Sequence, residues 1–402
     1  MVRRFTSHTL AGLATIGLFA LSAGCAGDGH GTVDPLSGDP ALFRWELPPG
    51  FTPPPVPDAN PMSAAKVELG RRLFYDTRLS GNGAFACSSC HRQEQGFSDA
   101  KNVPLGSTGE AHTRNSMALA NVGYLQTLNW ADTATSTLEA QALIPMFGEH
   151  PIELGLKGRE SELLQRLQAE PVYQQLVPKS FPGEADPWTV PNVTRAIAAF
   201  QRTFISAHAP YDRYRRGQNQ AISAAAKRGE LLFFSTRTRC VQCHNGALFT
   251  LAGGPPLDAP AGALPPPPAA PASQAFFNTG LYNVNGTGAY PPRNRGLFEL
   301  SGRLEDMGRM RVPSLRNVAL SFPYMHDGSI STLEEVIDHY ARGGRLVQTG
   351  PNAGDGQLNP FKSELVQGFP ITPQEKADLV AFLHSLTDST FITSRRFSNP
   401  WR

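Results

Sequence analysis

The pattern Cys-x-x-Cys-His occurs twice in this chain, at residues 87–91 and again at residues 240–244. Two thiols at this spacing can add to the vinyl groups on one edge of a porphyrin, and the adjoining histidine can supply an imidazole to the iron. A single Cys-x-x-Cys more often marks zinc or a redox dithiol, but no further cysteine pair completes a zinc site here. We therefore predict two covalently bound c-type haems. Their attachment residues are Cys87, Cys90, His91, Cys240, Cys243 and His244.

The fifth cysteine, Cys25, ends an N-terminal export segment and leaves no disulfide framework. A basic start precedes an apolar run at residues 10–21, which is too short for a comfortable membrane span. The following Ala-Gly-Cys resembles a bacterial lipobox, although Leu21 stands one place further from the cysteine than usual. We expect residues 1–25 to be a signal peptide with a lipid anchor at Cys25, on the periplasmic side of the bacterial envelope. Ordinary signal-peptidase cleavage is the alternative, and it also exports the protein.

The chain has 402 residues, which is enough for two domains with cores of their own. Its net charge is +2 with both signs interspersed, so nothing indicates nucleic-acid binding. The 35 prolines and 38 glycines predict long irregular loops. Residues 26–60 are expected to be a flexible tether, and the Pro/Ala/Gly-rich residues 253–272 a surface insertion outside the core.

A weak internal repeat predicts the fold class. A helix capped by Ser63 is expected to run to Phe74, and its Gly-x-x-Leu-Phe ending returns at residues 229–233, before the second motif. We expect a mainly α protein with two cytochrome c-like haem domains, at residues 61–215 and 216–402. Further helical patterns lie at residues 160–169, 190–205, 333–340 and 373–386, the last with a capping box formed by Thr372 and Glu375.

The second axial position of each iron separates electron transfer from peroxide binding. After the first motif the nearest candidate ligand is His112. After the second motif the candidates are Met307, Met310, Met325, His326 and Tyr340. Tyr340 shares a helix face with residues 333, 336 and 337, so spacing alone favours a buried core tyrosine over a phenolate ligand.

Several further stretches extend the pattern beyond the haem motifs. They are Arg114-Asn115, Trp130, Pro-Ile-Glu-Leu-Gly at 151–155, Val-Pro-Ser-Leu-Arg-Asn at 312–317 and Pro-Tyr-Met-His-Asp-Gly at 323–328. With them the chain, over residues 61–390, resembles the bacterial dihaem cytochrome c peroxidase and MauG superfamily. The peroxidases place a methionine where Tyr340 stands, whereas MauG-like enzymes place an axial tyrosine there. The peroxidases also carry a removable histidine near the position of Ser107, and His112 lies too close to Arg114 to match it.

The resemblance assigns roles around the first haem, which would bind peroxide on the side opposite His91. Glu153 would move a proton between the peroxide oxygens, with Gln141 assisting in the same pocket. Trp130 would relay oxidising equivalents between the haems. The plain alternatives are a solvated loop carboxylate for Glu153 and a packed core residue for Trp130.

For the second haem the resemblance implies ligation by His244 and Tyr340, with His326 in a nearby hydrogen-bond network and Met325 in packing. It also implies a calcium ion between the haems. The ion would be held by Asn115 and by the carbonyl groups of Ser321 and Pro323. No acidic cluster supports calcium independently.

The resemblance implies that hydrogen peroxide forms a charge-shared bis-ferryl state, which oxidises a tryptophan or tyrosine of a periplasmic partner protein. The lipobox and general likeness point further to the MbnH-type lipoprotein enzymes, which resemble MauG but modify a tryptophan of a copper-binding partner. MauG relays through a tryptophan just before its second haem motif, where this chain has Thr238 and Arg239. Two alternatives stay open. One is a dihaem cytochrome c peroxidase with a small cytochrome as electron donor, and the other is a non-enzymatic dihaem electron carrier.

Overall fold

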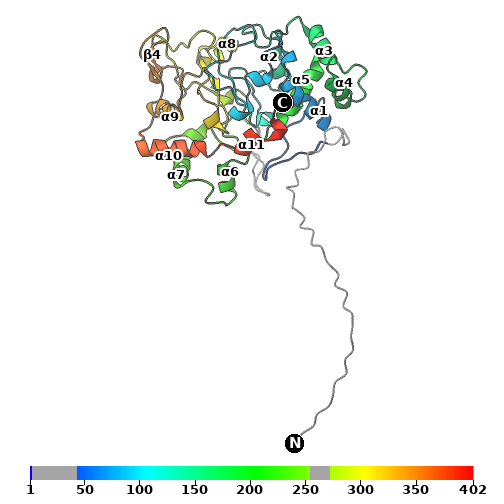
Figure 1. The fold of residues 1–402 in the computed structure, drawn as a ribbon. Coiled ribbons are helices and arrows are strands. Elements are labelled where there is room, and N and C mark those ends of the chain that lie inside the picture. The colour runs from blue at the N-terminus through cyan, green and yellow to red at the C-terminus, as the bar shows by residue number, and fades with distance from the viewer. Residues whose placement is uncertain (2–42, 254–271, 402) are drawn as a thin grey trace.

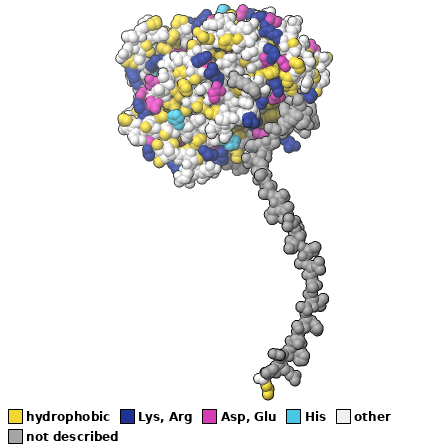
Figure 2. Space-filling view, viewed as in Figure 1, with side chains coloured by type: hydrophobic (Ala, Val, Ile, Leu, Met, Phe, Trp, Pro, Cys, Tyr) yellow, Lys and Arg dark blue, Asp and Glu magenta, His cyan; other side chains and the backbone are white. Residues whose placement is uncertain are grey.

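The computed structural model describes Met1, residues 43–253 and residues 272–401. Nearly all of the predicted signal peptide with Cys25, residues 26–42 of the predicted tether and most of the insertion at 253–272 lie outside the described residues. Among the residues that are described, no helix combines the length and apolar character needed to cross a membrane. On the face drawn in Figure 2, basic and acidic side chains are interspersed, in keeping with the small net charge.

The described chain is mainly helical, as predicted, with long irregular connections between its helices (Figure 1). The α-helices are α1 Ala64–Phe74, α2 Leu138–Phe147, α3 Glu160–Gln168, α4 Pro171–Ser180, α5 Val190–Arg202, α6 Pro210–Arg215, α7 Ala224–Phe233, α8 Phe298–Ser301, α9 Leu333–Arg342, α10 Pro373–His384 and α11 Ser389–Thr393. Two small antiparallel sheets pair β1 Phe276–Phe277 with β2 Met310–Arg311, and β3 Leu346–Val347 with β4 Gly354–Asp355. Phe276 is paired with Arg311 in the first sheet, and Leu346 with Asp355 in the second.

The first half of the molecule is built on the crossing of α1 and α5. Helix α1 begins where predicted, because the Ser63 side chain accepts a hydrogen bond from the N–H of Lys66. At the crossing Gly70 is required: a Cβ atom there would lie 1.9 Å from the carbonyl oxygen of Ala196. Around this contact a core of aromatic rings forms, in which Phe200 is fully buried.

The second half repeats this crossing with α7 and α10. A Cβ atom on Gly229 would lie 1.9 Å from the carbonyl oxygen of Asp378, and the neighbouring Phe382 is fully buried. The capping box of Thr372 and Glu375 forms as predicted. The two helix pairs lie on opposite sides of the molecule in Figure 1. The duplicated unit expected from the Gly-x-x-Leu-Phe repeat is therefore present in the structure, whereas the boundary between residues 215 and 216 stays a prediction.

Two helices end earlier than their sequence patterns indicated. Helix α10 ends at His384, short of residue 386, because the N–H of Leu386 turns to the carbonyl of Leu383. Helix α5 ends at Arg202, short of residue 205, and the N–H of Phe204 likewise turns to the carbonyl of Gln201. In each case the chain leaves the α-helix through a hydrogen bond between residues three apart, which is the bonding pattern of a 3₁₀ turn.

The segments after the two haem motifs also correspond. The N–H of Asn121 donates to the carbonyl of Phe204 at 2.7 Å, and its side-chain oxygen accepts from the N–H of Ser206 at 2.9 Å. Asn317 repeats both bonds in the second half, donating to Leu386 at 3.1 Å and accepting from Asp388 at 2.7 Å. Each asparagine therefore ties the chain after a haem motif to the end of that half's last long helix.

Candidate haem sites

The first motif forms a short 3₁₀ turn that places both thiols and the histidine on one site. The N–H of His91 donates to the carbonyl of Cys87 at 3.0 Å. Its Nδ1 lies 2.8 Å from the carbonyl oxygen of Phe97, so Nδ1 carries the proton and Nε2 keeps its lone pair for a metal. Burial lowers the pKa of His91, which favours the neutral imidazole that ligation needs.

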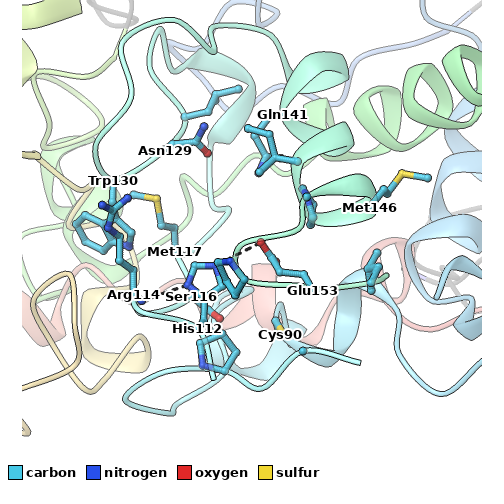
Figure 3. A pocket seen from close by; sticks show the side chains of 18 of the residues that line it. Cys90, His112, Arg114, Ser116, Met117, Asn129, Trp130, Gln141, Met146 and Glu153 are labelled. Carbon is cyan, nitrogen blue, oxygen red and sulfur yellow. Dashed lines mark hydrogen bonds and ion pairs between the residues drawn. The ribbon is translucent and has the colours of Figure 1, made fainter. Parts of the chain in front are cut away.

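A cavity of about 670 Å³ opens beside this turn, within the size range of cofactor sites (Figure 3). Side chains expected to act on peroxide line it together with the attachment residues. These are Cys87, Cys90, His91, Trp130, Gln141 and Glu153. The structure thus brings together all the residues predicted for the first haem, although they come from separate loops and from α2.

Glu153 lies in the loop between α2 and α3, and its position is fixed by its backbone. The N–H of Ser107 donates to the carbonyl of Glu153 at 2.7 Å. The side chain meets that of His112, whose Nε2 lies 3.3 Å from Oε1 of Glu153 (Figure 3). Gln141 projects from α2 into the same cavity. The predicted acid–base group therefore stands in a pocket and not on an open surface.

Trp130 lines this cavity and also contacts the second half of the chain. Its indole N–H donates to the carbonyl of Asn115 at 2.9 Å. Its own carbonyl accepts from the N–H of Arg311, on β2, at 2.8 Å. The indole is therefore held by one half of the chain and its backbone by the other.

The second motif repeats the geometry of the first. Nδ1 of His244 lies 3.1 Å from the carbonyl oxygen of Phe249, which again leaves Nε2 for a metal. Burial lowers the pKa of His244 to about 4, so its imidazole is neutral at ordinary pH. Cys240 and Cys243 are half-buried free thiols.

Tyr340 lies beside this second motif. Burial raises the pKa of its phenol, and the sulfur atoms of Cys243 and Cys240 act in the same direction. A phenol in such surroundings stays neutral unless a cation stands next to its oxygen. The helix that carries it, α9, is held by a capping box of Thr332 and Glu335.

The methionine candidates lie elsewhere or serve in packing. Met307 is buried in a cluster with Tyr282 and Tyr290, and Met325 packs against the same cluster. Met310 is buried on β2. His112 is engaged with Glu153 and so is not placed as a sixth iron ligand in this structure.

Both motifs fit covalent haem. Each offers two free thiols and a histidine whose Nε2 is unused, and the first opens onto a cavity of suitable size. Among the described residues, no group of three or more His, Cys, Asp or Glu side chains is placed to hold a metal ion.

Asn115 and Pro323, two of the residues predicted for calcium, lie together. The Asn115 amide nitrogen lies 3.3 Å from the carbonyl oxygen of Pro323, and 2.7 and 3.4 Å from those of Lys101 and Asn102. Ser321 follows a 3₁₀ turn nearby in the chain, and the role of its carbonyl stays a prediction.

His326 is buried, and it joins the network around Asn115 through its backbone. Its carbonyl accepts from the N–H of Asn115 at 2.8 Å. Its Nε2 has no hydrogen-bond partner within the described chain, and burial lowers its pKa to about 4 while Asp327 opposes that shift. The neighbouring Asp327 accepts instead from the hydroxyl of Tyr282 at 2.7 Å.

Two features of this region were not predicted from the sequence. The guanidinium of Arg311 is buried, with Nη2 against the sulfur of Met117 at 3.4 Å and Nε and Nη1 unpaired among the described residues. Burial lowers its pKa to about 10. The only signal was its place directly before the 312–317 stretch. The contact of His112 with Glu153 was also missed, because His112 had been considered only as an iron ligand.

Two haem-attachment turns on two equivalent helix crossings define a dihaem protein of the cytochrome c type. The family described as di-haem cytochrome c peroxidase matches residues 64–220 of the chain. The cytochrome-c peroxidase IdrP1 of Pseudomonas sp. (strain SCT) is 36% identical over 352 residues, covering 84% of each chain. The methylamine utilization protein MauG of Methylophilus methylotrophus is 33% identical over 334 residues, covering 83% of this chain and 85% of MauG.

A solved structure, described as a MauG-like protein associated with microbial copper homeostasis, is 46% identical with a TM-score of 0.83. The match covers 90% of this chain and 100% of that one. The chain therefore belongs to the di-haem cytochrome c peroxidase family, which includes MauG. It is a haem-dependent oxidoreductase that uses peroxide.

Proposed function

We propose that the protein is a MauG-like enzyme that uses hydrogen peroxide to oxidise an aromatic residue of a partner protein. The observation that carries the proposal is the position of Tyr340 on α9, whose Leu333 and Ile337 pack in one hydrophobic cluster with Cys240 of the second motif. A tyrosine at this position is the feature by which MauG-like enzymes differ from the methionine-bearing peroxidases. The 46% identity to a MauG-like protein supports the same branch.

When bound, the haems supply the iron that takes up peroxide and stores its two oxidising equivalents. The chain supplies proton control at the first site. Glu153 faces the cavity with one carboxylate oxygen held by His112, so the other is available to take a proton from one peroxide oxygen and return it to the other. Gln141, on the adjoining wall, provides an amide to orient the bound molecule. Each peroxide takes up two electrons and two protons and leaves as two waters, and the partner provides the electrons.

The loop at residues 104–115, which packs against the loop that carries Glu153, is proposed to offer no removable iron ligand. A Cβ atom on Gly106 would lie 1.8 Å from the carbonyl oxygen of Ile152, so the loops are in close contact. The Glu110 carboxylate accepts from the N–H of Ile152 at 3.1 Å. These contacts hold the loop in place and engage His112 with Glu153, so we expect the first site to take up peroxide without prior reduction.

Trp130 is placed to carry oxidising equivalents between the two halves. It lines the first cavity, and its backbone is bonded to Arg311 of the second half. Tyr340 and His244 then serve as the ligands of the second haem. The route from there to the surface differs from that of MauG, because Thr238 and Arg239 precede the second motif.

The partner is proposed to be a periplasmic protein concerned with copper. The basis is the similar structure described as associated with microbial copper homeostasis. Export through residues 1–25 and lipid attachment at Cys25 would hold the enzyme at the periplasmic face of a membrane, where such a partner is accessible. Mass spectrometry of the mature N-terminus tests the anchor: a diacylglyceryl cysteine supports it, and an unmodified or missing Cys25 contradicts it.

The experiment that tests the proposal is the addition of stoichiometric peroxide to the purified all-ferric protein. We expect both ferric EPR signals to disappear together, with a long-lived near-infrared absorption band that reports charge shared by two haems. If the protein ignores peroxide until it is half-reduced and then turns over with reduced cytochrome c, it is a peroxidase like its IdrP1 relative. If neither form reacts with peroxide, the electron-carrier hypothesis holds.

Calcium between the haems is a further part of the proposal. Three carbonyl oxygens converge on the Asn115 amide, whose oxygen and nitrogen can exchange places by a flip, and this is an arrangement that calcium can join. Chelator treatment of the purified protein, followed by elemental analysis, tests this directly. One calcium per chain, with a lower melting temperature after its removal, supports the site. A metal-free native protein contradicts it.

A further inference from the structure

We propose that His112 is a positioning residue for Glu153, holding its carboxylate so that one oxygen faces the peroxide site. The inference rests on the proposed role of Glu153 in moving protons. From the sequence, His112 was considered only as a candidate axial ligand of the first iron. The contact between the two side chains gives it a different task.

The hydrogen bonds of the imidazole fix its tautomer. The backbone N–H of Arg114 donates to Nδ1 of His112 at 3.1 Å, so Nδ1 is an acceptor and carries no proton. The proton of the neutral ring therefore lies on Nε2, which faces Oε1 of Glu153 at 3.3 Å. His112 is the donor and the carboxylate is the acceptor.

The backbone holds both side chains in this relationship. The N–H of His112 donates to the carbonyl of Pro104 at 2.9 Å, and the N–H of Ser107 donates to the carbonyl of Glu153 at 2.7 Å. The loop that carries the imidazole is thus bonded directly to the loop that carries the carboxylate. The pairing follows from docked backbones and does not depend on two freely rotating surface side chains.

The geometry leaves the second carboxylate oxygen for chemistry. Within the described chain, Oε2 of Glu153 accepts no hydrogen bond, and both side chains line the cavity beside Cys90 and His91. The two side chains keep 24% and 30% of their surface, so the pair is open to the cavity and not sealed in a core. A donor on Oε1 holds the carboxylate in one orientation, with Oε2 left free of hydrogen bonds within the described chain.

Three substitutions separate the donor role from a merely structural one. His112→Gln keeps an N–H donor at about the reach of Nε2. His112→Asn keeps an acceptor for the Arg114 N–H, so the loop is preserved, but its amide is too short to reach Glu153. His112→Leu removes both functions. His208→Leu is the matched control, because His208 is exposed and makes its hydrogen bond to Asp388 through its backbone.

The measurement is the second-order rate constant for peroxide with the all-ferric protein, together with the haem spectrum and the melting temperature of each variant. We expect His112→Asn and His112→Leu to slow the reaction about 10- to 100-fold, because losing the hydrogen-bond partner of a group that acts at a site typically has an effect of this size. The haem spectra should be unchanged. His112→Gln should recover most of the rate. The His208→Leu control should match the wild type.

A double-mutant cycle sharpens the test. If His112 acts through Glu153, then His112→Asn should add no further loss to a Glu153→Gln protein. A His112→Asn variant that keeps the wild-type rate overturns the inference. So does a His112→Gln variant as slow as His112→Asn, or a double variant whose losses multiply.

Failure of the proposed function would be recognised separately. If the wild-type protein reacts with peroxide only when half-reduced, the MauG-like proposal fails, and the same cycle is run on the half-reduced enzyme. Peroxide still meets Glu153 there, so a slow His112→Asn with a rescued His112→Gln supports the positioning role in either enzyme. If all the His112 variants react at the same rate as the wild type, the positioning role is rejected, whether the protein is MauG-like or a peroxidase.

Discussion

The backbone N–H of Arg311 donates to the carbonyl oxygen of Trp130 at 2.8 Å, and this bond has a counterpart. The N–H of Asn115 donates to the carbonyl oxygen of His326 at the same distance. Arg311 stands 196 residues after Asn115, and His326 stands 196 residues after Trp130. The two halves of the chain therefore exchange equivalent hydrogen bonds across their junction, and Trp130 and His326 occupy equivalent places on either side of it.

This junction makes Trp130→Phe an informative change. The backbone bond to Arg311 does not depend on the side chain, so both haems should stay attached with ordinary ferric spectra. The indole that lies between the halves is lost, and we expect the near-infrared band after peroxide addition to be abolished. Stopped-flow spectroscopy should still show peroxide consumption at the first haem. A band of wild-type intensity would mean that oxidising equivalents cross by another route.

Tyr340→Phe removes the hydroxyl beside the second motif while retaining the ring. Because the attachment residues are untouched, we expect two covalent haems by pyridine haemochrome assay, but an altered ferric EPR spectrum for the second haem. The near-infrared band should also be lost. Tyr340→Met is the informative companion, since it restores the methionine of the peroxidase branch and should confer a need for partial reduction. If the spectrum of Tyr340→Phe is unchanged, Tyr340 is not an iron ligand and serves only in packing.

Glu153→Gln removes the acid–base function from the first cavity with little change in volume. General acid–base groups contribute about 10²- to 10⁴-fold, and we expect the peroxide rate constant to fall by that order. Ferric spectra and haem content should be unaffected, because the carboxylate touches neither His91 nor the thiols in the hydrogen bonds of the structure. Peroxide kinetics equal to those of the wild type would remove Glu153 from the reaction.

The sequence was sufficient to predict those elements that depend only on residues close together in the chain. Ser63 as a helix cap and the box of Thr372 and Glu375 need only contacts within one turn, and both formed as predicted. The haem turns belong to the same class, because five consecutive residues carry their chemistry. The early ends of α5 and α10 were missed because a polar–apolar pattern does not distinguish α from 3₁₀ bonding in a last turn.

Contacts between distant segments could not be predicted in this way. His112 and Glu153 are 41 residues apart, and no periodicity connects them. The burial of Arg311 arises only when β2 reaches Trp130, and no local pattern in the sequence marks it. The resemblance to a family supplied the roles of Glu153, Trp130 and Tyr340, whereas pattern and spacing alone left each one open.

The buried ion pair of Arg316 and Asp212 supports the second haem site. Nη1 of Arg316 lies 2.6 Å from both carboxylate oxygens, and its Nη2 donates to the carbonyl of Ala247, just after the second motif, at 2.6 Å. Asp212→Asn leaves a buried cation uncompensated, and we expect a loss of about 3–5 kcal/mol in unfolding free energy. Urea denaturation measures it. Glu305→Gln, which breaks the exposed pair with Arg303, should show no measurable change.

Asp388 gives the protein a predictable loss of stability in acid. Burial alone would raise the pKa of Asp388. Hydrogen bonds from Thr390, from the N–H groups of His208 and Phe391 and from Ser206 outweigh burial and hold that pKa below its usual range. A carboxyl group whose pKa is lower in the folded state stabilises the fold above its unfolded pKa, about 3.9, and loses that contribution as the pH falls through the folded value. The folded protein should therefore weaken steeply below about pH 4.

The substitution that tests this origin is Asp388→Asn. It should lower the unfolding free energy at pH 7. It should also flatten the dependence of that free energy on pH below about pH 4, because the group whose pKa differs between the folded and unfolded states is gone. Thr390→Val deletes only the hydroxyl that donates to Asp388 at 2.6 Å, so it should give a smaller change in the same direction. Urea unfolding curves at half-unit pH steps measure both. If the unfolding free energy of Asp388→Asn depends on pH as that of the wild type does, the acid sensitivity comes from another carboxyl group. Asp388 would then serve only as the N-cap of α11, without a contribution from its charge.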